Sequence, residues 1–405
     1  MDSRSPPPTS FTYERLDPPD ALRILELLPP SEEWNGLPAL RMRQRRPSEP
    51  YRCLSYMWGD QTERFDILVN QKLFSVGRNL YDFLLHWAGR PEASQPLWID
   101  AICINQTDND EKSVQVQRMG DLFSQGEETI IWLGPGTETD TQAMRWIQTV
   151  ETTVIHDDSW TKLESIVECW EDDAQDNLES FFSQDYWRRA RIVQEVVLSR
   201  RIVILSGPQT LDAEVLLRPP KWTNWYYLIG EYRFKCEYPQ AYETDRHIWS
   251  LGPAVRRLDS MPGFVVLTLR SQRGNDNGYL PNCFCMYNGP WLGNCSDPRD
   301  RIFSILSLVK QHEGASCIVR ADYSRSAKEV FDWVWEAEER HLQELQRNID
   351  TVHHVTDFAA ELKGALALED DETTRAFVAS VAAQMFQVEE RLIRAAQPME
   401  CKTFD

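Results

Sequence analysis

Residues 97–106 read Leu-Trp-Ile-Asp-Ala-Ile-Cys-Ile-Asn-Gln and carry the strongest structural signal in the chain. Up to Ile104 the run is almost wholly apolar and holds one acidic residue, Asp100, which predicts a strand buried on both faces of a sheet. A second buried strand is predicted over 129–133, where Gly134 and two following residues end it. Between them, residues 111–125 predict a helix, because Val116, Met119 and Phe123 share one helical face.

Further elements extend this pattern in both directions along the chain. Strands are predicted over 51–58, 66–69 and 202–205, and helices over 79–87 and 186–198. Residues 22–28 fit either an edge strand or one helical turn. Strands that alternate with helices predict an α/β fold with a parallel sheet flanked by helices.

The domain organisation follows from where this alternation begins and weakens. Residues 1–50 are predicted to be an N-terminal lead-in and 51–210 the α/β domain, with an acidic helical insertion at about 137–180. Residues 211–405 are predicted to be mixed and then mainly helical, with helices over 301–309, 327–341, 355–368 and 373–396.

Charge and cysteine usage exclude several classes of protein. The formal net charge is −20, from 43 basic and 63 acidic residues, so we expect no nucleic-acid partner, because the summed field repels polyanions. The longest apolar run, 264–269, is far shorter than the roughly 20 residues of a membrane span. The first ten residues lack a signal-peptide pattern, and nine scattered cysteines fit reduced thiols, so we expect a cytoplasmic protein.

Common cofactor and metal motifs are absent from the sequence. There is no Gly-x-Gly-x-x-Gly after a strand, no Walker A motif and no Gly-x-Ser-x-Gly elbow. Cys283, Cys285 and Cys295 match no common zinc spacing, so we expect no metal and no resident cofactor.

Three segments carry a family resemblance. They are Tyr51-Arg-Cys-Leu-Ser-Tyr-Met-Trp-Gly-Asp60, the run from Leu97 to Gly134, and Tyr186-Trp-Arg-Arg-Ala-Arg-Ile-Val-Gln-Glu-Val196. Together they resemble the fungal heterokaryon incompatibility (HET) domain over about residues 51–200. The resemblance implies a role in non-self recognition and regulated cell death. It also implies, more distantly, a fold similar to the Toll/interleukin-1 receptor (TIR) domain.

Enzymatic TIR domains cleave NAD at the nicotinamide–ribose bond, and the resemblance places their catalytic glutamate at Glu195. NAD would then be the substrate, and the active form a homo-oligomer with a possible protein partner in non-self recognition. The chain departs from the family at Arg191, where a second tryptophan is usual. The candidate substrate-binding residues lie at predicted strand ends or near Glu195: Ser55, Tyr56, Trp58, Asp60, Trp98, Asp100, Asn105, Arg188 and Arg191.

Simpler interpretations remain for the same residues. Glu195 points away from the apolar stripe of its predicted helix, so it also fits a solvated carboxylate paired with Arg191. Asp100 fits a buried structural anchor better than a site group, and Asp60 fits a turn cap equally well. The whole domain also fits a non-enzymatic TIR-like module that signals by homotypic assembly, or a regulator whose acidic helices mask the domain.

Overall fold

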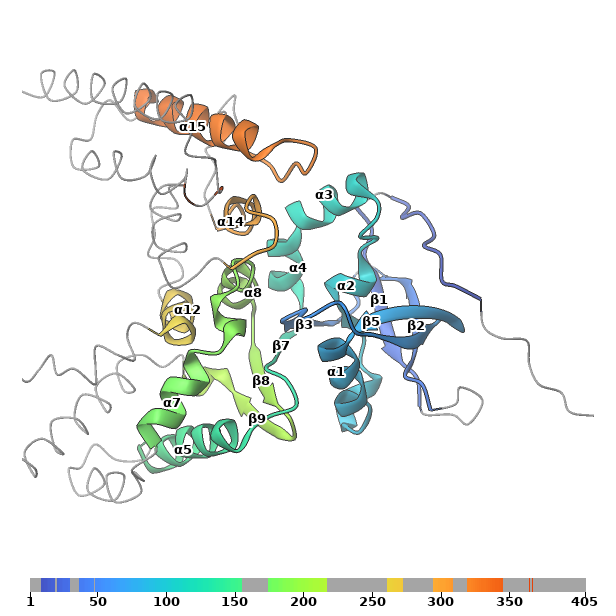
Figure 1. Cartoon of the computed structure of the whole chain (residues 1–405), viewed down its shortest axis with the longest axis vertical. Helices are drawn as coiled ribbons and strands as arrows, with labels where there is room; N and C mark the ends of the chain where they lie inside the picture. Colours follow the sequence, from blue (N-terminus) through green and yellow to red (C-terminus); the bar gives the residue numbers. More distant parts are fainter. Residues whose placement is uncertain are drawn as a thin grey trace, which may run out of the picture. The chain divides into compact units, whose positions relative to one another are not determined.

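The structure, a computed structural model, describes residues 9–18, 20–29, 36–46, 48–154, 174–216, 261–271, 294–308, 319–344, 364 and 366. The chain divides into two compact units, residues 1–275 and 276–405. The first unit contains a sheet with helices around it, so the predicted α/β class is confirmed (Figure 1).

The sheet has nine strands in the order β5-β4-β2-β1-β6-β3-β7-β8-β9. The strands are β1 (Arg23–Leu27), β2 (Ala39–Gln44), β3 (Arg52–Tyr56), β4 (Arg64–Val69), β5 (Lys72–Gly77), β6 (Leu97–Trp98), β7 (Glu128–Trp132), β8 (Ile202–Ser206) and β9 (Gln209–Asp212). The sheet is mixed, because β1 runs antiparallel to β2 and β6, β4 to β5, and β8 to β9.

Four parallel strands form the centre of the sheet. β3 pairs in parallel with β6 on one side and with β7 on the other, and β7 pairs in parallel with β8. Every residue of β7 is buried, as expected for a parallel strand covered on both faces. In chain order these strands are arranged second, first, third and fourth, so the strand order reverses at β3: the chain passes from β3 to β6 on one side of it and then crosses to β7 on the other.

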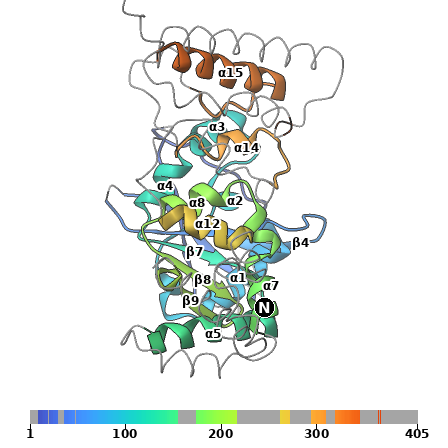
Figure 2. The ribbon, with the colours of Figure 1, turned by 90° about the vertical axis from the view of Figure 1, so that its left-hand side faces the viewer.

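Helices cover this sheet. They are α1 (Arg78–Ala88), α2 (Asp100–Cys103), α3 (Asn109–Gln117), α4 (Met119–Gln125), α5 (Glu138–Val154), α7 (Ala174–Phe182), α8 (Ile192–Leu198) and α12 (Pro262–Ser271), with 3₁₀ helices η2 (Pro91–Ser94), η3 (Asp185–Arg188) and η4 (Ala213–Val215). The buried residues of α1 form one apolar stripe: Leu80, Phe83, Leu84 and Trp87. α5 and α7 lie side by side, and α12 lies beside α8 (Figure 2).

The predicted strand over 97–104 is wrong beyond Trp98. The chain turns into α2, where the Cys103 amide donates to the Ile99 carbonyl at 2.7 Å. The Asp100 carboxylate accepts from the Ala101 amide at 2.7 Å and so satisfies a free donor of the first helical turn. A short apolar run does not distinguish a buried strand from a buried helix.

Other predicted elements also differ from the structure. The predicted helix over 186–198 is the 3₁₀ helix η3 and the separate helix α8. Residues 111–125 form two helices, α3 and α4, separated at Arg118. Residues 22–28 form a strand, but β1 lies inside the sheet between β2 and β6, not at its edge. The lead-in therefore supplies two strands to the same sheet as residues 51–210, while the predicted domain boundaries stay predictions.

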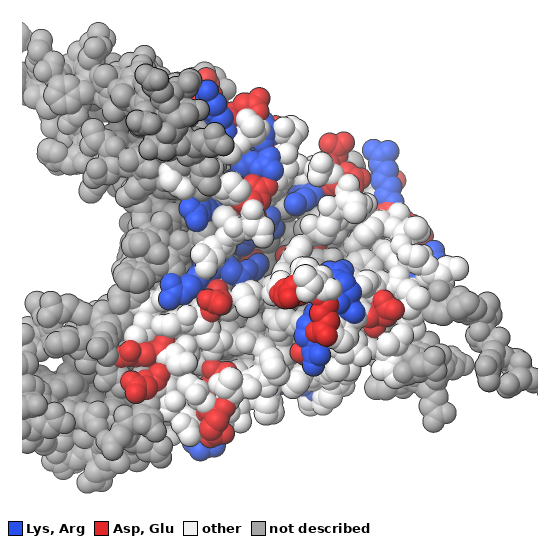
Figure 3. Space-filling view, in the orientation of Figure 1, with Lys and Arg blue, Asp and Glu red and all other residues white. Residues whose placement is uncertain are grey.

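The second unit is described in part and is helical there, with α14 (Asp300–Phe303) and α15 (Ala327–Glu344). The predicted helices over 355–368 and 373–396 lie almost wholly outside the described residues, as do 155–173 of the acidic insertion. In the described part of the chain no helix combines the length and apolarity that crossing a bilayer needs. On the face drawn in Figure 3, acidic and basic side chains are intermixed.

Candidate functional site

The carboxyl end of β3 places Ser55 at the centre of a buried polar cluster. Ser55 Oγ donates a hydrogen bond to Glu195 Oε2 on α8, and it lies 2.7 Å from the hydroxyl of Tyr186 on η3. Because the single Ser55 proton goes to Glu195, the Tyr186 hydroxyl donates to Ser55. One chain of hydrogen bonds thus joins β3 to η3 and α8, which are distant from β3 in sequence.

Glu195 itself is buried, with 2% of its surface exposed. The interpretation as a solvated carboxylate is wrong, because α8 is buried on all sides from Ile192 to Val197. Burial raises the pKa of the Glu195 carboxyl, and the nearby Asp100 raises it further, while Arg189, Ser55 and Arg191 act in the opposite direction. A buried ionisable group held among charged neighbours is typical of functional sites.

Asp100 is the second buried carboxylate of the cluster. It follows β6 directly, so it lies near the carboxyl end of the strand next to β3. The indole Nε1 of Trp58 donates to its two oxygens at 3.3 and 3.2 Å. Burial raises the pKa of Asp100, and Arg189 and Arg191 oppose this shift.

Two members of the cluster were not among the predicted site residues. Arg189 donates from Nη1 to the Tyr56 carbonyl and is the cation with the largest effect on the pKa of both carboxylates. Tyr186 anchors Ser55. Both lie in the Tyr186–Val196 motif, so the motif itself was the signal. Helical spacing favoured Arg188 and Arg191 over Arg189 because it assumed one helix over 186–198, whereas the chain forms η3 and a separate α8.

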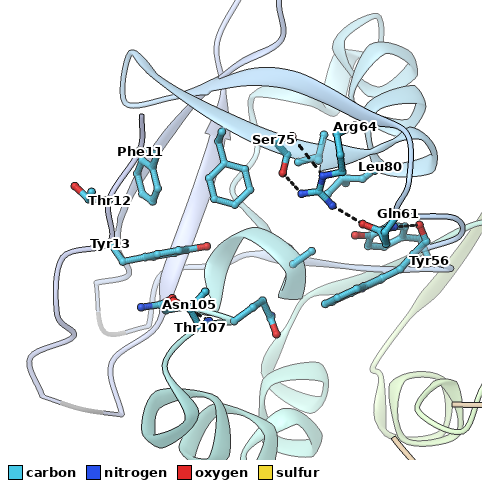
Figure 4. A pocket seen from close by; sticks show the side chains of 16 residues that line it. Phe11, Thr12, Tyr13, Tyr56, Gln61, Arg64, Ser75, Leu80, Asn105 and Thr107 are labelled. Carbon is cyan, nitrogen blue, oxygen red and sulfur yellow. Dashed lines mark hydrogen bonds between the residues drawn. The ribbon is translucent and has the colours of Figure 1, made fainter. Parts of the chain in front are cut away.

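A pocket of about 530 Å³ adjoins this cluster (Figure 4). Tyr56 and Trp58 line it, and so does Asn105 from the loop after α2. Glu195 and Asp100 do not line the pocket. The Trp58 indole, which also bonds to Asp100, connects the pocket with the buried carboxylates.

Comparison with known proteins identifies the segment that carries this cluster. A family model described as heterokaryon incompatibility protein (HET) matches residues 51–195. Residues 51–195 are similar to the HET domain. The match begins beside β3 and ends at Glu195, so it contains every member of the cluster.

One relative supports this assignment. Heterokaryon incompatibility protein 6, OR allele, of Neurospora crassa is 34% identical over 153 residues, which make up 33% of this chain. The match spans 22% of the length of that relative. No solved structure matches the chain significantly.

Four predicted site residues remain, namely Trp98, Asp60, Arg188 and Arg191. Trp98 is fully buried and packs edge-to-face on Phe123, with ring centroids 5.6 Å apart, so it does not face a ligand. Asp60 is exposed and caps its own turn by accepting from Thr62 N at 2.8 Å. Arg188 lies half-buried in η3, and Arg191 precedes α8 as its N-cap.

No metal centre is found within the part of the chain that the structure describes, where no three His, Cys, Asp or Glu side chains converge. Cys295 is a free thiol, while Cys283 and Cys285 lie outside the described residues.

The raised pKa of Glu195 predicts how the stability of the HET domain depends on pH. A carboxyl whose pKa is higher in the folded chain stabilises the fold fully below its unfolded pKa of about 4.3. That contribution is lost as pH rises through the folded pKa. We therefore expect Glu195→Gln to gain stability relative to wild type between pH 5 and pH 8, by about 1.4 kcal/mol for each pKa unit crossed.

Urea unfolding at the two pH values measures this difference. The exposed Glu127 provides the control, since Glu127→Gln should track wild type at both. If Glu195→Gln also tracks wild type, the buried carboxylate does not carry the expected penalty.

Proposed function

We propose that this chain is a HET-domain effector of incompatibility-type cell death that hydrolyses NAD at the nicotinamide–ribose bond. The observation that carries the proposal is the buried Glu195 carboxylate, hydrogen-bonded to Ser55 at the carboxyl end of a central parallel strand. The HET family and the Neurospora relative support the biological role. The buried cluster supports NAD hydrolysis as the reaction.

The position of the cluster in the sheet supports a ligand site. Open α/β sheets bind ligands outside the carboxyl ends of their strands, where the strand order reverses. β3 is the strand at which the order reverses here. The second-first-third-fourth order also supports a TIR-like architecture, because it brings the segments that carry Ser55 and Glu195 together at one edge.

The proposed reaction requires one carboxylate to stabilise a positive charge. Cleavage of the N-glycosidic bond leaves its electron pair on nicotinamide, which departs neutral, and the ribose carbon becomes oxocarbenium-like. Ionised Glu195 would stabilise that charge in a low-dielectric setting. Water then adds to the ribose carbon and releases a proton, giving ADP-ribose.

The surrounding residues have separate parts in this proposal. Ser55 orients the Glu195 carboxylate, and Arg189 and Arg191 favour its ionised form. Tyr56 and Trp58 line the adjoining pocket, where an aromatic ring can stack on a planar base. Asp100 anchors Trp58 and the start of α2.

Expression in a fungal host tests the proposal. We expect wild type to kill the cells and deplete cellular NAD, and Glu195→Gln, at equal protein level, to do neither. Killing by wild type without NAD loss would contradict the enzymatic mechanism and favour the assembly module. If both variants deplete NAD, Glu195 is not the catalytic residue.

A further inference from the structure

The pocket beside the cluster has two chemically different ends (Figure 4). At one end lie Phe11, Tyr13 and Phe74, whose rings meet edge-to-face with centroids 5.0 to 6.3 Å apart. At the other lie Arg64 and Gln61, whose side chains are hydrogen-bonded at 2.6 Å. An aromatic end joined to a cationic end suits a ligand with a planar ring and an anionic group.

The aromatic end is held in place by the lead-in rather than by the HET domain alone. The Phe11 amide donates to the Leu73 carbonyl at 2.9 Å, so the lead-in runs along β5. The Tyr13 hydroxyl donates to the Ile102 carbonyl at 2.9 Å. Phe11 and Phe74 remain half-buried, which leaves ring surface available for stacking.

The charge of the pocket is unusual for so acidic a chain. Sixteen residues line it, and among these Arg64 is the only charged one. Within the described part of the chain no carboxylate pairs with Arg64; its guanidinium bonds to Gln61 and Ser75. A guanidinium that has no carboxylate partner, in a pocket without acidic side chains, favours the binding of a phosphate.

A hydrogen-bond donor lies at the aromatic end, beside Tyr13 (Figure 4). The Asn105 carbonyl oxygen accepts from Thr107 Oγ1 at 2.8 Å, which fixes the amide plane. The side-chain nitrogen Nδ2 of Asn105 has no partner among the described residues, and Asn105 belongs to the pocket lining. It can donate to a ring nitrogen of a base, and such donors give a base site its specificity.

We propose that this pocket binds the adenosine monophosphate half of the dinucleotide, with the base at Phe11 and Phe74 and the phosphate at Arg64. The inference rests on the proposed function for its substrate. It adds a part of the site that lies outside the HET match, because Phe11 and Tyr13 precede residue 51. The nicotinamide half would then lie toward Tyr56 and Trp58, next to the buried carboxylates.

Calorimetric titration of the full chain with AMP tests this binding without any need for catalysis. We expect AMP to bind wild type, and Phe11→Leu, Phe74→Leu and Arg64→Gln each to weaken it about tenfold. The binding of ribose 5-phosphate, which has no base, should be weakened by Arg64→Gln and unaffected by Phe74→Leu. Leucine keeps apolar volume and removes the ring, so the fold should survive.

Matched controls lie on neighbouring elements. Phe65 is a half-buried ring on β4 that stacks on Tyr81, and Arg78 is an exposed arginine that pairs with Asp82. Neither lines the pocket, so Phe65→Leu and Arg78→Gln should leave AMP affinity unchanged. AMP that fails to bind at millimolar concentration, or that binds equally to Phe74→Leu and Phe65→Leu, would overturn the proposal.

The two proposals fail in different ways. NAD hydrolysis that AMP does not inhibit, with no AMP binding, overturns the pocket assignment and leaves Glu195 as the catalytic residue. AMP binding that is lost in Phe74→Leu, with no NAD hydrolysis by wild type, overturns the enzymatic function and supports the pocket as a nucleotide site.

Discussion

Glu195→Gln is expected to lower the rate of NAD hydrolysis by at least about a hundredfold, the usual scale for lost transition-state electrostatics. Glutamine keeps the shape of the side chain and its oxygen can still accept from Ser55. It removes the negative charge that would face the ribosyl cation. The fold should persist, because the substitution also removes a buried charge.

Asp100→Asn provides the matched comparison, since Asp100 is the other buried carboxylate of the same cluster. If Asp100 anchors Trp58 and α2, its substitution should lower turnover less than tenfold. Initial rates of nicotinamide release at saturating NAD measure both variants. Equal rates for wild type and Glu195→Gln would refute the catalytic role, and equal losses in both variants would show that the two carboxylates act as a pair.

Arg23→Ala is expected to destabilise the first unit by about 3–5 kcal/mol, the cost of breaking a buried ion pair from one side. Arg23 of β1 donates from Nη2 to Glu111 Oε2 at 3.0 Å, and from Nη1 to the Cys103 carbonyl at 2.9 Å. Its side chain is 5% exposed and that of Glu111 10%. Truncation leaves the Glu111 carboxylate without its cation and frees the end of α2.

Arg43→Ala on the neighbouring β2 is the control. Arg43 pairs with Glu26 and Glu49, but its side chain is 28% exposed, so its loss should cost less than about 1 kcal/mol. Urea unfolding gives both free energies. A loss no larger for Arg23→Ala than for Arg43→Ala would show that the lead-in does not depend on the buried pair.

The central sheet could be predicted from sequence because its strands carry continuous apolar runs. β3, β7 and β8 lie where the runs over 51–58, 129–133 and 202–205 predicted them. β2 lies in the lead-in, where no strand was predicted over its residues. It is a strand because it pairs with β1 and β4, and such pairing is not visible in a local pattern.

The environment of Glu195 could not be predicted from the pattern of its own helix. Helical spacing separates an apolar stripe from its opposite face, and it assumes that the opposite face meets water. α8 instead contacts α4 on one side and α12 on another, while Glu195 meets β3. α12 is distant from α8 in sequence, so the local pattern of α8 could not predict that α12 packs against it.

Sequence reasoning predicted which residues form the candidate site better than it predicted how they are arranged. Ser55, Asp100 and Glu195 were among the predicted site residues, and the structure brings them together at the carboxyl ends of the parallel strands. Trp98 was selected as a stacking ring, but it packs into the core on Phe123. Arg188 and Arg191 were selected instead of Arg189, because one helix over 186–198 would place them on the face of Glu195. The chain forms η3 and a separate α8, and Arg189 is the arginine that reaches the Tyr56 carbonyl.

The release of nicotinamide from NAD by the purified wild-type chain tests the central claim most directly. The chain is incubated with NAD, with and without a crowding agent that promotes assembly, and the products are separated by chromatography. We predict nicotinamide and ADP-ribose in equal amounts, increasing with time and protein concentration. NAD that remains intact under both conditions, with a folded protein, would contradict the account.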